Sequence, residues 1–182
     1  MVVNNNIKRR TIMIFPEFSN MQVIDKIREK YDPLFKHVRG HVTLAFTFKS
    51  NLTQSEIEEH IKRVCVEFKS FKLSLQGILK VDNEFGRYLF LEVRQGRKTI
   101  KELSCRLYTG ILESYKPEWF SDEKLLPHMT IGQFKNKNEI DRAFEEVQDI
   151  KDKFTTTVNK ISVEIVDENE DSIIEFDVAL RD

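Results

Sequence analysis

The chain has 182 residues, of which 40% are hydrophobic and 32% are charged, a composition typical of a single globular domain. Its 29 basic and 30 acidic residues leave a formal net charge of -1, which argues against bulk binding of nucleic acid or of an anionic membrane. Cys65 and Cys105 are too few for a disulfide framework or a zinc site. No apolar run approaches the roughly 20 residues that span a bilayer, and residues 1–10 lack the apolar stretch of a signal peptide, so we expect a cytoplasmic protein.

The first half of the chain is predicted to alternate between strands and helices. The clearest element is the helix that opens at Thr53, because Glu56 completes a capping box three residues later. Strands are assigned where β-branched and aromatic residues alternate with polar ones, and helices where apolar residues recur every three or four positions. The predicted elements are a strand at 11–15, a helix at 20–32, a strand at 41–48, a helix at 53–68 and a hairpin with strands at 72–81 and 87–93.

The second half repeats this order of elements. It is predicted to contain a helix at 97–115, a strand at 128–134, a shorter helix near 140–147 and a hairpin with strands at 161–165 and 174–180. Each half therefore runs helix, strand beginning with histidine, helix, hairpin. We expect an α+β fold in which antiparallel sheets with flanking helices are related by a pseudo-two-fold axis around a central cleft. A single domain would span residues 1–182, with lobes of roughly 1–86 and 87–182.

The two predicted strands that begin with histidine share a pattern. One reads His41-Val42-Thr43-Leu44-Ala45-Phe46 and the other reads His128-Met129-Thr130-Ile131-Gly132-Gln133. Because side chains alternate along a strand, each strand should present an imidazole, a hydroxyl and a small residue on one face. The opposite face should be buried, with Val42, Leu44 and Phe46 in the first strand and with Met129 and Ile131 in the second.

Two imidazoles facing one phosphate would suffice for a phosphoryl-transfer reaction. One neutral histidine would take a proton from the attacking oxygen and one protonated histidine would give a proton to the leaving oxygen, because an ordinary pKa near 6.5 allows both forms. Thr43 and Thr130 would donate hydrogen bonds to the non-bridging oxygens, where charge grows in the transition state. A lone His-x-Thr has no diagnostic value, so the prediction depends on the pair. We expect His41 and His128 to act without a metal or another cofactor.

On these residues, the chain resembles the two-histidine (2H) phosphoesterase superfamily, which includes RNA 2′,3′-cyclic phosphodiesterases and 2′-5′ RNA ligases. The resemblance rests on His41-Val42-Thr43-Leu44 and His128-Met129-Thr130-Ile131, and the repeated order of elements extends it over almost the whole chain. It implies a bilobal α+β fold, a metal-free cleft and activity on cyclic or 2′-5′ phosphodiesters. Some members follow the second motif with a basic residue, where this chain has Gln133.

Other residues are weaker candidates for the site. Arg39 lies two positions before His41, so an extended backbone would direct its side chain toward the same phosphate. We interpret the basic run Lys8–Arg10 as solvated, with guidance of an RNA end as the alternative. His37 and His60 are expected at the surface. The candidates for an aromatic residue that stacks on a base are Tyr88 and Trp119, and the sequence selects neither.

Three functions fit the motifs. The first is hydrolysis of a 2′,3′-cyclic phosphate at an RNA 3′ end or in a nucleotide. The second is reversible 2′-5′ RNA ligation, which uses the same acid and base with a ribose hydroxyl in place of water. The third is a module that binds an RNA end or a nucleotide without turnover. In each case we expect a monomer that binds a small ligand or one RNA terminus, because the net charge does not favour long duplexes.

Overall fold

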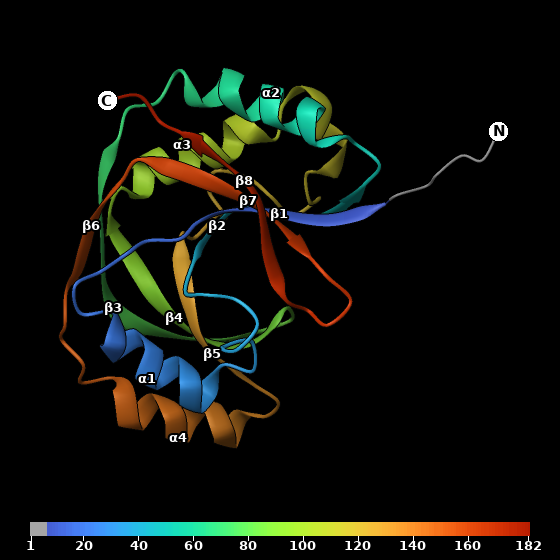
Figure 1. Ribbon diagram of the computed structural model, residues 1–182. Helices are drawn as coiled ribbons and strands as arrows, with labels where there is room; N and C mark the ends of the chain where they lie inside the picture. The colour runs from blue at the N-terminus through green and yellow to red at the C-terminus, as the bar shows by residue number, and fades with distance from the viewer. Residues whose placement is uncertain (1–6) are drawn as a thin grey trace.

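The computed structural model describes residues 7–182 (Figure 1). Residues 1–6 lie outside the described residues. They are part of the segment 1–10 that we expect to lack a signal peptide. The helices are α1 (Met21–Tyr31), α2 (Gln54–Cys65), α3 (Arg97–Leu107) and α4 (Lys137–Val147), with a 3-10 helix η1 (Gly110–Tyr115). The strands are β1 (Lys8–Ile14), β2 (Val42–Ser50), β3 (Phe71–Asn83), β4 (Gly86–Gln95), β5 (His128–Phe134), β6 (Phe154–Val158), β7 (Lys160–Val166) and β8 (Ser172–Ala179). Among residues 7–182, no helix is both long enough and apolar enough to cross a membrane.

The strands form two antiparallel sheets, which confirms the predicted α+β class. The first sheet has the order β2-β1-β7-β8 and the second sheet has the order β5-β4-β3-β6. Helices α2 and α3 lie against the first sheet, whereas α1 and α4 lie against the second (Figure 1). The edge strands β2 and β5, which follow or begin with the two motif histidines, contact each other.

The sheets do not divide the chain near residue 86. Strands β3 and β4 lie on either side of that point, yet they pair with each other in the second sheet because they form one hairpin. The first sheet instead combines β1 and β2 with β7 and β8, so it draws on both ends of the described chain. Each sheet with its covering helices therefore contains segments from both sides of residue 86.

Two stretches depart from the predicted elements. The single helix expected at 97–115 is divided into α3 and η1, because Thr109 between them has an extended backbone, with φ of -122° and ψ of 168°, and Gly110 follows with a φ of 54°. Strand β6 was not predicted from the sequence, since its central residues are threonines and only Phe154 and Val158 at its ends are buried. It pairs with β3 and forms an edge of the second sheet.

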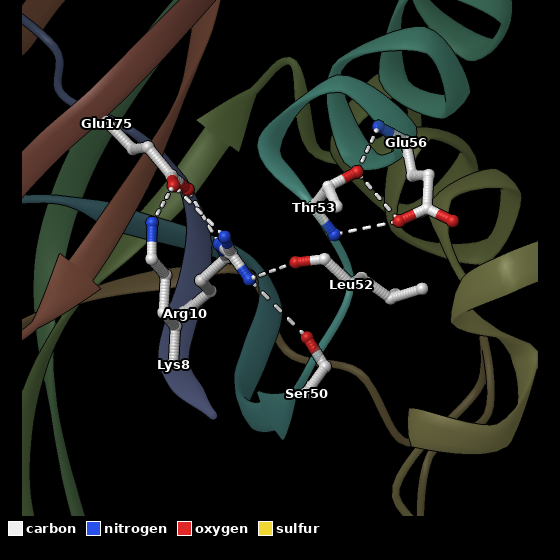
Figure 2. A network of polar contacts seen from close by, with 7 residues as sticks. All are labelled: Lys8, Arg10, Ser50, Leu52, Thr53, Glu56 and Glu175. Atoms are coloured by element: carbon white, nitrogen blue, oxygen red, sulfur yellow. Dashed lines mark hydrogen bonds and ion pairs between the residues drawn. The ribbon is translucent and has the colours of Figure 1, made fainter. Parts of the chain in front are cut away.

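Helix α2 begins where the sequence predicts, but His60 on this helix is not at the surface as expected. The capping box is confirmed, with the Thr53 side chain accepting from the Glu56 backbone N–H and the Glu56 carboxylate accepting from the Thr53 N–H (Figure 2). His60 is buried rather than exposed: its Nε2 lies 2.9 Å from the carbonyl oxygen of Leu107. That carbonyl is in the last turn of α3, where helix carbonyls lack partners within the helix. His60 therefore has a structural role, joining α2 to α3.

The basic run at the start of β1 is not solvated as expected. The Arg10 guanidinium is buried and forms two hydrogen bonds to the Glu175 carboxylate of β8, at 2.6 and 3.0 Å, and a third to the carbonyl of Leu52 (Figure 2). Lys8 reaches the same carboxylate at 2.9 Å. Side chains alternate along β1, so Arg9 points to the opposite face, where it pairs with Glu170 at 2.7 Å. The run therefore ties β1 to β8 and to the turn that precedes β8 in the chain's C-terminal hairpin.

Candidate active site

His41 and His128 are held in the same way. His41 lies one position before β2, and its Nδ1 is 2.8 Å from the carbonyl oxygen of Arg39. His128 is the first residue of β5, and its Nδ1 is 2.6 Å from the carbonyl oxygen of Leu126. A carbonyl only accepts hydrogen bonds, so in both rings Nδ1 carries the hydrogen and Nε2 is the nitrogen that exchanges a proton. Neither Nε2 has a hydrogen-bond partner within residues 7–182.

The two motifs also share a backbone irregularity. In β2, Thr43 pairs with Met13 and Ala45 pairs with Ile12, so Leu44 is an extra residue in the ladder. In β5, Ile131 is the extra residue, because Thr130 pairs with Phe90 and Gly132 pairs with Leu89. Each histidine strand therefore carries a β-bulge at the fourth residue of its motif.

The bulges correct the predicted arrangement of side chains after each motif. A bulge shifts the alternation by one residue, which turns Phe46 toward the face of His41 and Thr43 instead of the core. Phe46 is half-buried and lines a pocket together with His41 and Thr43. Gln133 occupies the equivalent position in β5 and is exposed.

The histidines lie in the same region of the molecule. Gly40, next to His41, packs so closely on Met129, next to His128, that a Cβ on Gly40 would lie 3.0 Å from the Met129 sulfur. A positive charge on His41 also contributes to lowering the pKa of His128. The sequence positions that begin the two motifs are therefore brought side by side by the contact between β2 and β5.

The surroundings lower the pKa of both imidazoles. Burial is the main cause in each case, because a recessed ring loses the water that would stabilise its charged form. For His128 the pKa falls to about 4. Its ring stacks face to face on Phe90, with centroids 3.5 Å apart, whereas His41 meets Phe15 edge-on at 6.0 Å. The two rings thus have the same anchor and different aromatic neighbours.

The remaining predicted site residues lie around these rings. Thr43 and Thr130 are half-buried on β2 and β5, each two residues after its histidine. The Arg39 side chain is exposed, and its guanidinium carbon lies 4.7 Å from the centroid of Phe15, the ring that contacts His41. Within residues 7–182, histidine, cysteine, aspartate and glutamate side chains form no group of three or more that could hold a metal ion.

A pocket of about 160 Å³ opens beside His41 on the face of the first sheet. The sequence did not identify this pocket, because its walls come from three strands, β1, β2 and β7, and from residues that precede or follow these strands in the chain. Its lining includes Arg9, Thr11, Met13, Leu34, Val38, His41, Thr43, Phe46, Thr47, Glu164, Val166, Glu170 and Ser172. The sequence also did not identify Phe90, whose contact with His128 depends on the pairing of β4 with β5.

The candidate base-stacking residues lie in two aromatic groups near the motifs. Tyr88 stacks on Phe90, with centroids 5.5 Å apart, and so extends the stack that includes His128. Trp119 meets Phe46 edge-on at 5.0 Å, next to the pocket beside His41.

Comparisons with known proteins show similarity in sequence and in fold. A predicted phosphoesterase of Bacillus licheniformis is 25% identical over 126 residues, which is 67% of this chain and 69% of the relative. The fold is similar to TT0787 of Thermus thermophilus, with a TM-score of 0.64 and 15% identity over 95% of this chain and 98% of that one. It is also similar to E. coli LigT in complex with 3′-AMP, with a TM-score of 0.60 and 14% identity over 97% of this chain and 100% of that one. The profile of the 2′-5′ RNA ligase superfamily matches residues 15–170, and the chain belongs to this family of 2H phosphoesterases.

Proposed function

We propose that this protein is a metal-independent phosphodiesterase that hydrolyses the 2′,3′-cyclic phosphate of an RNA 3′ end or of a nucleotide. The observation that carries the proposal is the matched anchoring of His41 and His128. In both rings Nδ1 donates to a carbonyl two residues upstream, which leaves Nε2 available for proton transfer. Family membership and the relatedness to a predicted phosphoesterase support phosphoester chemistry at these residues.

In the proposed reaction, His128 is the base and His41 is the acid. His128 has its pKa lowered to about 4, so it is neutral at physiological pH and takes a proton from the attacking water. The new P–O bond forms as the bond to one ribose oxygen breaks, and His41 gives its Nε2 proton to that leaving oxygen. An anionic phosphate beside His41 favours the protonated ring, because an opposite charge raises the pKa of an imidazole. The product is a phosphomonoester.

Thr43 and Thr130 complete the proposed site. Each lies two residues after its histidine on an edge strand, so its hydroxyl is on the same side as the imidazole. We assign the two hydroxyls to the non-bridging phosphate oxygens, whose charge increases in the transition state. Arg39 is the proposed third phosphate ligand, since its guanidinium lies over Phe15, the ring that meets His41 edge-on.

The substrate class is supported by a structural relative and by charge. E. coli LigT, which shares the fold, is known in complex with 3′-AMP, a nucleotide with a phosphomonoester on its ribose. The formal net charge of -1 favours a single nucleotide or one RNA terminus over a long duplex, which would need many phosphate contacts.

The direct test is incubation of the protein with 2′,3′-cyclic nucleotides and with a short RNA that ends in a 2′,3′-cyclic phosphate, in buffer containing EDTA. We expect release of a phosphomonoester at an undiminished rate. A variant with both His41→Ala and His128→Ala serves as the control for contaminating activity. Turnover that disappears in EDTA and returns with a divalent cation would contradict the metal-free reaction, and equal turnover by the double variant would contradict the site.

Reversible 2′-5′ ligation is the second candidate, favoured by the family to which the chain belongs. By microscopic reversibility, the same base and acid act when a ribose 5′-hydroxyl replaces water. Incubation with paired RNA ends, one with a cyclic phosphate and one with a 5′-hydroxyl, followed by analysis of the joined product, distinguishes the two. Binding of a cyclic nucleotide with neither product would instead identify a binding module.

A further inference from the structure

The pocket beside His41 contains a buried carboxylate that the proposed reaction does not use. Glu164 of β7 is 4% exposed and lines this pocket together with Thr11, Thr47 and Ser172. Within residues 7–182, no lysine, arginine or histidine forms an ion pair with it. Burying an ionised carboxylate costs free energy unless other groups donate hydrogen bonds to it.

The hydroxyls of the pocket are directed toward this carboxylate. Ser172 donates its hydroxyl to Oε2 of Glu164, and Thr11 is a second donor. The Thr11 and Thr47 hydroxyls are 2.9 Å apart, so a chain of hydroxyls runs from β2 across β1 to Glu164 on β7. Burial raises the pKa of Glu164, while the hydrogen bonds from Ser172 and Thr11 favour its charged form.

This network leaves the carboxylate able to accept more hydrogen bonds than it receives. An ionised carboxylate has about four lone-pair positions, and the two hydroxyls fill at most two of them. A molecule that enters the pocket therefore stabilises Glu164 only if it brings hydrogen-bond donors. An entering acceptor would face an uncompensated negative charge.

The size and position of the pocket further restrict which hydrogen-bond donor can enter it. A cavity of about 150 Å³ holds one benzene molecule, so the pocket of about 160 Å³ matches a single six-membered ring. Phe46 provides an aromatic wall, and His41 and Thr43 lie in the same lining, next to the proposed phosphate position. Among the groups attached to a cyclic nucleotide, a pyrimidine base with an amino group fits these conditions. Glutamate accepting from the N4 amino group of cytosine is a known mode of base recognition.

We propose that this pocket binds the base of the nucleotide and that Glu164 accepts a hydrogen bond from the amino group of cytosine. The enzyme then prefers cytidine 2′,3′-cyclic phosphate to the uridine compound, because uracil presents its O4 acceptor where cytosine presents a donor. Purines are poorer substrates, since two fused rings exceed the volume. The inference rests on the proposed function for the position of the phosphate.

The test compares kcat/KM for the four 2′,3′-cyclic nucleotides in the wild type and in Glu164→Gln. We expect the wild type to favour cytidine over uridine by roughly tenfold or more, as a specific hydrogen bond to a base supplies. In Glu164→Gln the amide also offers a donor to O4 of uracil, so the ratio falls toward one or below. The ratio is measured within one protein, which removes any loss of folded protein from the comparison.

Two controls separate this pocket from the catalytic step. Glu168→Gln makes the same chemical change in the exposed turn between β7 and β8, outside the pocket lining, and should keep the wild-type ratio. Titration calorimetry with 3′-CMP and 3′-UMP measures the preference without turnover. A preference in binding with no hydrolysis of any cyclic nucleotide would reject the proposed function and keep the pocket. Equal use of all four bases, preference for a purine, or a ratio unchanged in Glu164→Gln would overturn the pocket assignment.

Discussion

The first and second sheets present the same histidine motif in different surroundings. In both, an edge strand carries the motif, the ring is anchored to a carbonyl two residues upstream, and a bulge follows the threonine. The neighbouring strand differs. Thr43 lies opposite Met13 on β1, whereas Thr130 lies opposite Phe90 on β4. The repeated fold therefore sets the geometry of the two imidazoles, and the adjacent strand sets what surrounds each of them.

This difference explains where the pocket lies. Thr11 and Met13 on β1 leave an open space of about 160 Å³ beside His41. On β4 the corresponding face carries Tyr88 and Phe90, whose rings stack on each other, and Phe90 also stacks on His128. His41 thus borders the pocket that we propose for the base of the nucleotide, and His128 is packed against the Phe90 ring.

Removal of either imidazole is the change with the largest expected effect, and it tests whether the two motifs are equivalent. His41→Ala and His128→Ala should each lower kcat by about 10²–10⁴, because each removes one partner of the acid and base pair. The double variant should be little slower than the slower single variant, since the two act as a unit. Rate measurements should be paired with thermal unfolding, which should change little. A single variant with near wild-type activity would show that only one motif is catalytic.

A second test concerns how the first sheet is held together. Glu175→Gln should destabilise the protein by about 3–5 kcal/mol, because it leaves the buried Arg10 guanidinium without a counter-charge. Glu170→Gln is the matched control: both Glu170 and its partner Arg9 are partly exposed to solvent, which screens the pair, so the loss of stability should be much smaller. Chemical denaturation measures both. Equal effects of the two substitutions would show that the buried pair contributes no more than the exposed one.

The difference between the two rings also predicts the pH dependence. As base, His128 must be neutral, so kcat/KM should fall below its pKa of about 4. As acid, His41 must be protonated. Because burial lowers the pKa of His41 below the ordinary 6.5, kcat/KM should also fall as the pH rises toward 6.5. A bell-shaped profile with its maximum between about pH 4 and 6.5 is expected. A rate that continues to rise above about pH 7 would contradict these protonation states.

The smallest expected effect isolates the aromatic stack. Phe90→Leu should raise the pKa of His128 toward its ordinary value and move the acid limb of the pH profile upward by about one unit, because the ring loses a flat apolar cover. Phe15→Leu is the control on the other side, and its effect should be smaller, since Phe15 meets His41 only edge-on at 6.0 Å. Equal shifts for both variants would show that the stack is not the source of the difference.

Much of the site was accessible from the sequence because it depends on local patterns. The motifs at His41 and His128, the capping box at Thr53 and the hairpin strands all come from residues close together in the chain. Alternation alone, however, does not reveal a bulge, which depends on the register with the neighbouring strand. Phe46 was therefore assigned to the wrong face.

The features that the sequence did not show depend on contacts between distant segments. His60 lies on a charged stretch of helix, and only the position of α3 explains why it is buried against the Leu107 carbonyl. In the sequence, nothing distinguishes Glu164 from the other Asp and Glu residues, which number 30 in total. Only the folded arrangement of β1 and β2 places Thr11 and Thr47 beside it. Sequence patterns identified His41 and His128 as the candidate catalytic pair, and tertiary structure was needed to find the pocket and the stacked ring.

The participation of both ends of the chain in the first sheet has a consequence for biosynthesis. During translation, β1 and β2 are made before β3 to β6, and β7, which lies next to β1, is made after them. The second sheet is complete at Val158, before β7 begins at Lys160. Because β7 does not exist until β3 to β6 have been made, we expect β1 to keep one unpaired edge during that part of synthesis. The strands that surround His128 are thus all synthesised before Glu164 and Ser172, which line the pocket beside His41.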